Sequence, residues 1–295
     1  MNAFSRSLVA LDLSLMDKKL LEYVASMTGI LETQKVYFVH IIPDLNVPKN
    51  IDAEFHKLFA PEYPVDEKIR DKIALDVEGA FGQLKGIELS VEVREGSPYD
   101  KLIHWTDVKD IDLLIVGKKQ VSEGSGITVK RVARNTECNV LFVPEKATNE
   151  IDRILVPVDF SDNSAKALRA AVDICESLPG TKVTCLYVVD LPIDDYYSRS
   201  LQNVGYKAVL MDAAQQAYDK FIEENNFDLD LIEPVFVENY FQNTAQHIHE
   251  YATKHPCELI IVGAQGHTAF QNFLYGSVTE RLVEKITETP LMIVR

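Results

Sequence analysis

A loop between residues 263 and 277 carries residues whose types and spacing suit anion binding. It follows the apolar run 259–262 and holds Gly263 and Gly266, and it ends in Gly276 and Ser277. Glycine has no Cβ, so it permits positive φ angles and a close approach of backbone to ligand. Ser277 opens a predicted helix, where the first N–H groups lack partners and the dipole is positive. The pattern therefore predicts a phosphate-binding cradle.

The elements that must position this loop occur twice in the chain of 295 residues, which is about twice the usual size of one domain. The matching segments are 7–14 and 154–161, 35–42 and 182–189, 112–117 and 258–263, 126–131 and 276–281, and 139–143 and 290–294. An internal repeat indicates two copies of one domain. The polar segment 145–152 is the expected boundary, which gives domains 1–148 and 149–295.

Apolar, β-branched runs alternate with helical patterns in each half. In the second half we predict helices over 164–177, 202–225, 244–254 and 277–286. The first of them follows a cap region at Asp162 and Asn163, and the third lies behind Asn243. Strands that are apolar throughout and alternate with helices indicate a parallel sheet covered on both faces. The sequence therefore predicts two flavodoxin-like α/β domains, each with five parallel strands.

Ligands of open parallel sheets bind at the carboxyl ends of the strands, where the strand order reverses. The first strand of the second half ends in Pro157, Val158 and Asp159, and the glycine loop follows the fourth strand at Val262. Both ends are expected to border one crevice. Asp159 can accept hydrogen bonds from a ribose or an adenine amino group, and Val188 ends the second strand, where its backbone can meet a purine.

The spacing Gly263-x-x-Gly266-x9-Gly276-Ser277 resembles the ATP-binding pattern of the universal stress protein family, and residues 157–161 also fit that family. The resemblance covers nearly all of both halves and implies a tandem member with two adenine nucleotide alpha hydrolase-like domains. It also implies that strands 140–143 and 291–294 pair antiparallel, which makes an intramolecular pseudo-dimer, with a homodimer as a further option. Pairing would remove two exposed sheet edges.

The resemblance implies an ATP site in the second half, with or without Mg²⁺. It assigns Asp159 and Val188 to base and ribose, Gly263 and Gly266 to ribose and α/β-phosphates, and Gly276, Ser277, Val278 and Thr279 to β/γ-phosphates. His267 lies in the loop, where it can touch a phosphate. One departure is that Ala264 and Gln265 stand where many members carry Ser-His or a similar pair.

The sequence gives little support to catalysis. It has no GxxxxGK(S/T) motif and no kinase-like HRD or DFG set to position a phosphoryl acceptor. Ser277 and Thr279 either help to hold Mg²⁺ or cap the last helix. We therefore expect an ATP-binding sensor or adaptor in stress regulation with little or no hydrolysis. The alternative is an interaction scaffold whose glycine loop is only a structural turn.

The first half departs from the pattern. Gln120 stands where the second glycine belongs, and Gly117 is followed by Gly126 after 9 positions, against 13 in the second half. We expect this half to keep the fold without binding ATP strongly. Lys118 and Lys119 either form a solvated basic loop or attract an anion.

Charge and composition exclude several classes of function. Residues 1–148 carry 19 basic and 23 acidic side chains, and residues 149–295 carry 11 and 22. Such a chain repels nucleic acid, whose binding depends on Lys and Arg. Four cysteines without a CxxC pair indicate a reducing compartment, and no segment suits a signal peptide or a membrane span. We expect a cytoplasmic protein without a metal site.

The connection after the second strand is long in both halves. Segment 190–205 of the second half lies near the predicted base pocket and is either a lid or a cover for hydrophobic surface. Segment 43–64 of the first half holds three aromatic residues among prolines and is either a packed excursion or a flap for a partner.

Overall fold

The computed structural model describes residues 4–42, 65–119, 125–191, 206–240, 243–266 and 275–295. The chain divides into two compact units, Met1–Glu145 and Lys146–Arg295. This division lies at the start of the polar segment 145–152. Segments 43–64 and 192–205, which include nearly all of the two long connections, lie outside the described residues, as does His267.

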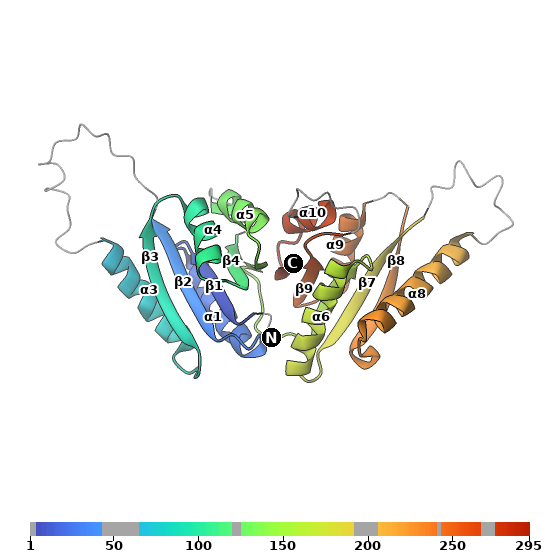
Figure 1. Ribbon diagram of the computed structural model, residues 1–295, viewed down its shortest axis with the longest axis horizontal. Helices are drawn as coiled ribbons and strands as arrows, with labels where there is room; N and C mark the ends of the chain where they lie inside the picture. The colour runs from blue at the N-terminus through green and yellow to red at the C-terminus, as the bar shows by residue number, and fades with distance from the viewer. Residues whose placement is uncertain (1–3, 43–64, 120–124, 192–205, 241–242, 267–274) are drawn as a thin grey trace, which may run out of the picture. The chain divides into compact units, whose positions relative to one another are not determined.

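Strands and helices alternate in both units, as the sequence predicts (Figure 1). The elements of the first unit are β1 (Arg6–Leu11), α1 (Leu15–Ile30), β2 (Lys35–Ile42), α3 (Val65–Phe81), β3 (Glu88–Glu95), α4 (Pro98–Val108), β4 (Leu113–Lys118), α5 (Ser125–Asn135) and β5 (Asn139–Pro144). Those of the second unit are β6 (Arg153–Val158), α6 (Asp162–Ser177), β7 (Lys182–Asp190), α8 (Tyr206–Asn225), a 3₁₀ turn (Leu229–Leu231), β8 (Ile232–Asn239), α9 (Thr244–Lys254), β9 (Leu259–Gly263), α10 (Ser277–Lys285) and β10 (Leu291–Val294).

All strands pair in parallel within each unit, and the order is β3-β2-β1-β4-β5 in the first and β8-β7-β6-β9-β10 in the second. The predicted class of five-stranded parallel α/β domains is therefore confirmed. One detail differs from the flavodoxin order 2-1-3-4-5, because the third strand here lies outside the second. The order reverses between β6 and β9, and between β1 and β4.

Helices cover both faces of each sheet. Crossovers between parallel strands are right-handed, so helices that connect strands in opposite directions lie on opposite faces. In the second unit, α6 and α8 therefore share one face and α9 and α10 the other (Figure 1). Contacts agree with this arrangement: Arg169 of α6 lies 4.2 Å from the ring of Phe227, just after α8, and Lys285 of α10 donates to Gln246 of α9 at 2.7 Å.

The central strands are buried on both faces, which explains why their sequences are apolar throughout. Ile260 and Ile261 of β9 are fully buried, as are Leu113 and Leu114 of β4. The outer strand β3 is more exposed and carries charged residues, as expected of a sheet edge.

Helix ends follow local capping. The predicted bounds of α9 are confirmed, and the Asn243 side chain caps it by accepting from the N–H of Gln246. For α6 the predicted cap region was one to two residues too late, because the N-cap is Ser161, whose hydroxyl accepts from the N–H of Ser164. Ser161 is the cap because its backbone is extended and its hydroxyl reaches the third N–H of the helix from there.

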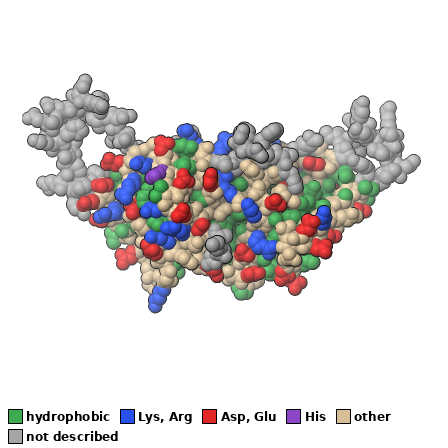
Figure 2. Space-filling model, viewed as in Figure 1, with side chains coloured by type: hydrophobic (Ala, Val, Ile, Leu, Met, Phe, Trp, Pro, Cys, Tyr) green, Lys and Arg blue, Asp and Glu red, His purple; other side chains and the backbone are tan. Residues whose placement is uncertain are grey.

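Acidic and basic side chains are interspersed on the face that Figure 2 shows. None of the described helices has the length and apolar character needed to span a membrane.

Helix α1 offers a direct test of this packing. Leu20 is 1% exposed and Leu15 is 97% exposed on the same helix. We expect Leu20→Ala to lower the free energy of unfolding by about 2–5 kcal/mol, because it removes buried methyl groups and leaves a cavity. Leu15→Ala is the matched control and should change it by less than about 0.5 kcal/mol. Urea unfolding of both variants measures the difference, and equal effects would contradict the burial of this helix face.

Candidate functional site

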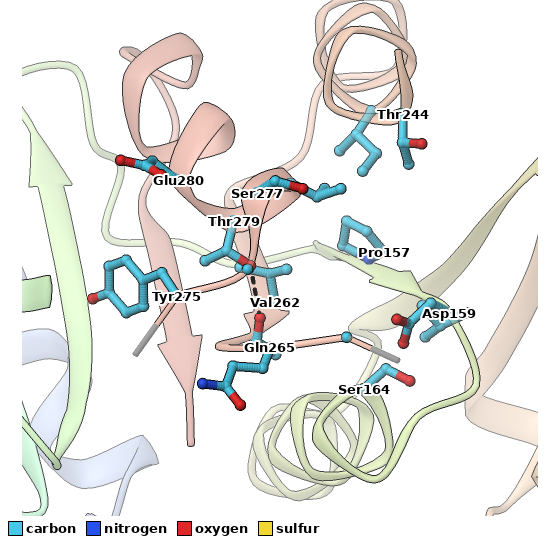
Figure 3. Close-up of a pocket in the computed structure, with 16 residues that line it drawn as sticks. Pro157, Asp159, Ser164, Thr244, Val262, Gln265, Tyr275, Ser277, Thr279 and Glu280 are labelled. Atoms are coloured by element: carbon cyan, nitrogen blue, oxygen red, sulfur yellow. Dashed lines mark hydrogen bonds between the residues drawn. The ribbon is translucent and has the colours of Figure 1, made fainter. Parts of the chain in front are cut away.

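A pocket of about 360 Å³ lies in the second unit where the strand order reverses. Its walls come from the ends of β6 and β9 and from the first turns of α9 and α10 (Figure 3). Strands β6 and β9 are direct neighbours, so their carboxyl ends open at the same edge of the sheet. This is the position at which open α/β sheets bind ligands.

Asp159, directly after β6, is held in place by the start of α6. Its Oδ1 accepts from the backbone N–H of Ser161 at 3.2 Å and from the Ser161 hydroxyl at 2.6 Å. Ser161 is the N-cap of α6, so the residue that begins the helix also orients the carboxylate. Oδ2 faces Gly266 across the pocket wall, and the carboxylate therefore stands at the junction of β6 and the glycine loop.

Phe160 lies between these two residues in a strained backbone conformation. Its φ is 64°, in the left-handed region that bulky residues rarely adopt. Its ring packs 4.4 Å from that of Tyr187 and 5.4 Å from that of Phe221, measured between centroids. The half-buried ring thus contacts β7 and α8, and the turn directs the chain from β6 into α6 beside the pocket.

Two glycines at the end of β9 are required by close packing. A Cβ on Gly263 would lie 2.8 Å from the backbone of Asn163 in α6, and one on Gly266 would overlap Oδ2 of Asp159. Neither glycine has a positive φ, so of the two properties that glycine permits only the close approach is used here. Their role in the fold is the close approach of β9 and its loop to β6 and α6.

Gly276 differs from these two glycines. It is the N-cap of α10 with φ −72°, and no side chain caps the helix there. Its N–H donates to the carbonyl of Ala264 at 2.8 Å, which joins the two ends of the loop. The first N–H groups of α10, at Ser277 and Val278, belong to residues that line the pocket. The helix therefore presents its positive end to the cavity.

The hydroxyl of Thr279 has a structural partner. It donates to the carbonyl of Gly263 at 2.9 Å, and the side chain is 3% exposed (Figure 3). Thr279 thus links the first turn of α10 to the end of β9 instead of capping its own helix.

Ten of the twelve residues predicted from the sequence line this pocket: Pro157, Val158, Asp159, Val262, Gly263, Gly266, Gly276, Ser277, Val278 and Thr279. Val188 does not line it, because it belongs to β7, one strand farther from the reversal point. His267 lies outside the described residues.

Sequence reasoning missed six lining residues: Ser164, Thr244, Ile248, Gln265, Tyr275 and Glu280. Thr244 and Ile248 are one helical turn apart on α9, which the sequence places after the third strand and not beside the loop. The fact that α9 returns from the outer strand β8 to the central strand β9 brings its first turn to the pocket. The correct strand order would have been needed to predict that Thr244 and Ile248 line the pocket.

The corresponding position in the first unit contains an ion pair. Lys119, the counterpart of Gln265 in the repeat, donates to Oδ2 of Asp12, the counterpart of Asp159, at 2.6 Å. Burial acts to raise the pKa of Asp12, but hydrogen bonds from Lys119 and Ser14 and the Lys119 charge hold it below its usual value. Both alternatives considered for Lys119, a solvated loop residue and a binding group for an external anion, are therefore replaced by an ion pair with a carboxylate of its own unit.

Comparisons with known proteins show the family of the chain. The model of the universal stress protein family matches residues 3–144 and 150–295. The chain is 28% identical over 158 residues to universal stress protein MJ0531 of Methanocaldococcus jannaschii, an alignment that covers 50% of this chain and 84% of that protein.

Two solved structures share the fold over almost the whole chain. A universal stress protein from Archaeoglobus fulgidus has a TM-score of 0.67 at 17% identity, covering 99% of this chain and 98% of its own. Protein PA1789 of Pseudomonas aeruginosa has a TM-score of 0.62 at 14% identity, covering 99% and 93%. Because the family model matches both repeats, the chain belongs to the universal stress protein family as a tandem member.

Proposed function

We propose that the pocket of the second unit binds ATP and that the protein acts as a nucleotide-responsive sensor or adaptor in stress regulation. The observation that carries the proposal is Gly276. A Cβ at this residue would meet its nearest neighbours at 3.6 Å, an ordinary contact, and its φ is open to any residue. The fold itself therefore does not require glycine at this position.

A ligand provides the reason for this glycine that packing does not. Ser, Asp or Asn at the N-cap would cap α10 slightly better, by a few tenths of a kcal/mol. Glycine instead leaves the first N–H groups of α10 open toward the pocket, where a phosphate can approach the backbone closely. Asp159, at the other side of the pocket, is placed to accept hydrogen bonds from a ribose (Figure 3).

Little or no hydrolysis is part of the proposal. The described lining residues include no lysine to bridge phosphates, and Asp159 and Glu280 are the carboxylates among them. Asp159 already holds the start of α6 through Ser161. A bound nucleotide in such a site stabilises one conformation more than another and so changes the surface presented to a partner.

The first unit is proposed to bind no ATP. Lys119 and Asp12 neutralise each other where the second unit has Gln265 and Asp159, and the loop is four residues shorter.

The antiparallel pairing of the two last strands stays a prediction. An interaction scaffold with an empty second pocket is the competing function, and the same experiments distinguish it.

We expect purified protein to bind one ATP per chain. The Gly276→Glu variant should lose this binding, because a charged side chain would fill the cradle and repel phosphate. Gly126→Glu, at the corresponding position of the first unit, is the matched control and should keep it. Chromatography of nucleotide released on denaturation and calorimetric titration with ATP measure both. Absence of binding at millimolar ATP in the wild type would favour the scaffold, and two ATP per chain would contradict the role assigned to the first unit.

The glycines should also separate by their effect on stability. Gly263→Ala should lower the free energy of unfolding by about 1–3 kcal/mol, because the new Cβ would overlap the backbone of Asn163. Gly276→Ala should cost less, about 0.5–1 kcal/mol, because alanine is a poorer N-cap than glycine but its Cβ would meet no close neighbour. Denaturant unfolding without nucleotide measures both values. A large loss for Gly276→Ala would mean that this glycine serves the fold.

A further inference from the structure

The outer edge of β3 presents backbone groups in a regular pattern. Among the described strands only β2 pairs with β3, which ends the sheet of the first unit (Figure 1). The N–H groups of Glu88 and Gly96 donate to carbonyls at the two ends of β2, so the even-numbered residues of β3 bond to that strand. Successive residues of a strand direct their N–H and C=O groups to opposite sides. Leu89, Val91 and Val93 therefore direct theirs away from the sheet.

The outer strand of the second unit, β8, is protected against such pairing. The carbonyl of Asn239 accepts from the N–H of Leu191 at 2.7 Å, so the odd-numbered residues of β8 face β7. Pro234 stands at an outward position and leaves a gap in the row of donors. Glu233 and Glu238 are the charged residues of β8, so two copies of it could form no ion pair. Strand β3 has no proline and carries charges of both signs.

The sequence of β3 is complementary to itself when two copies run antiparallel. Outward-facing residues must meet outward-facing residues, which limits the registers to those centred on a residue. The register centred on Val91 pairs residues 88–94 of both strands. It places Glu88 opposite Arg94 of the second copy, and Leu89 opposite its Val93. Opposite charges and apolar side chains directly across an antiparallel pair both stabilise it.

The neighbouring registers fit less well. A register centred on Glu92 would place this residue opposite its own copy, and one centred on Ser90 would place Glu88 opposite Glu92. Like charges directly opposite each other are destabilising. A register centred on Val93 joins Glu92 to Arg94 but pairs only residues 91–95. The register centred on Val91 is thus the longest one that matches the charges.

The charged residues of this register already have partners within their own chain, and pairing would extend these contacts. Lys35 forms an ion pair with Glu88, and Arg94 donates to Glu92 at 2.7 Å. The side chains of Glu88 and Arg94 are 67% and 51% exposed, so both remain open to a further partner. Across the edge, Lys35, Glu88 and the Arg94 and Glu92 of the second copy would form a row of alternating charge. No existing ion pair has to break.

We propose that two copies of this chain associate through the outer edges of their β3 strands, which pair antiparallel around a two-fold axis at Val91. A contact of one surface with its own copy closes at two chains, whereas pairing of β3 with β8 would continue into an open chain of molecules. The gap at Pro234 opposes that second arrangement. The proposed edge differs from the last strands, β5 and β10, and the inference does not rest on the nucleotide site.

The test is sedimentation velocity of the full chain over a range of concentrations. We expect the wild type to reach twice the mass of one chain. Arg94→Glu should weaken dimerisation at least about tenfold, because two acidic side chains then face each other at both ends of the paired segment. Glu88→Arg should have the same effect through two basic side chains. The double variant, Glu88→Arg with Arg94→Glu, should dimerise more strongly than either single variant, because opposite charges again face each other.

The control is Lys220→Glu, which reverses the charge of an exposed lysine in an ion pair on α8 and should leave the dimer unchanged. Circular dichroism checks that each variant is folded. A wild type that stays monomeric, or a dimer that Arg94→Glu does not weaken, would overturn the inference. Failure of the double variant to recover would overturn the register, since in the one centred on Val93 the reversed residue 94 would meet Glu92.

Amide hydrogen exchange followed by NMR gives a readout that does not depend on a variant. The N–H of Val91 should exchange more slowly as the protein concentration rises, because it enters a hydrogen bond only in the dimer. The N–H of Glu92 faces β2 and should be protected at every concentration. Exchange of the Val91 N–H that is independent of concentration, in a sample that sediments as a dimer, would place the dimer contact elsewhere and overturn the proposal.

Discussion

The close approach of the end of β9 to the start of α6 is the constraint on which the site depends. Gly263 permits it, because any Cβ there would collide with the backbone of Asn163. Strand order brings β6 and β9 together, but two neighbouring strands leave a crevice only if the chain beyond them turns without blocking it. With this contact made, Asp159 and the start of α10 border one cavity.

The two units serve as a comparison within one molecule. Both have the same strand order and both hold an aspartate after the first strand, so these features belong to the fold. The second unit alone has glycine at position 266 of the repeat pattern, where the first has Gln120, and in the first unit Asp12 and Lys119 form an ion pair. The Gln120 position and the shorter loop of the first unit are why one unit is expected to bind and the other is not.

Much of this could be predicted from the sequence, because its signals are local. The repeat and the alternation of strands and helices follow from apolar runs along the chain, and ten residues of the pocket follow from strand ends, glycine spacing and the family resemblance that this spacing carries. Thr244 and Ile248 could not be found in this way, since their place depends on which strands are neighbours. Val188 lies near the end of the second strand, as predicted, but it does not line the pocket, and the salt bridge of Lys119 required knowledge of a contact across 107 residues.

Comparing the two units also shows whether the backbone strain beside the pocket belongs to the fold or to a ligand site. A bulky residue with positive φ beside a binding site invites a functional explanation, and Phe160 is such a residue. Its counterpart Leu13 has a φ of 60° in the unit whose aspartate is already paired. The strain is thus a property of the turn from first strand to first helix, independent of any ligand. What distinguishes the second unit is Gly266, at the position of Gln120, and a loop four residues longer. The case for a nucleotide rests on these features together with Gly276.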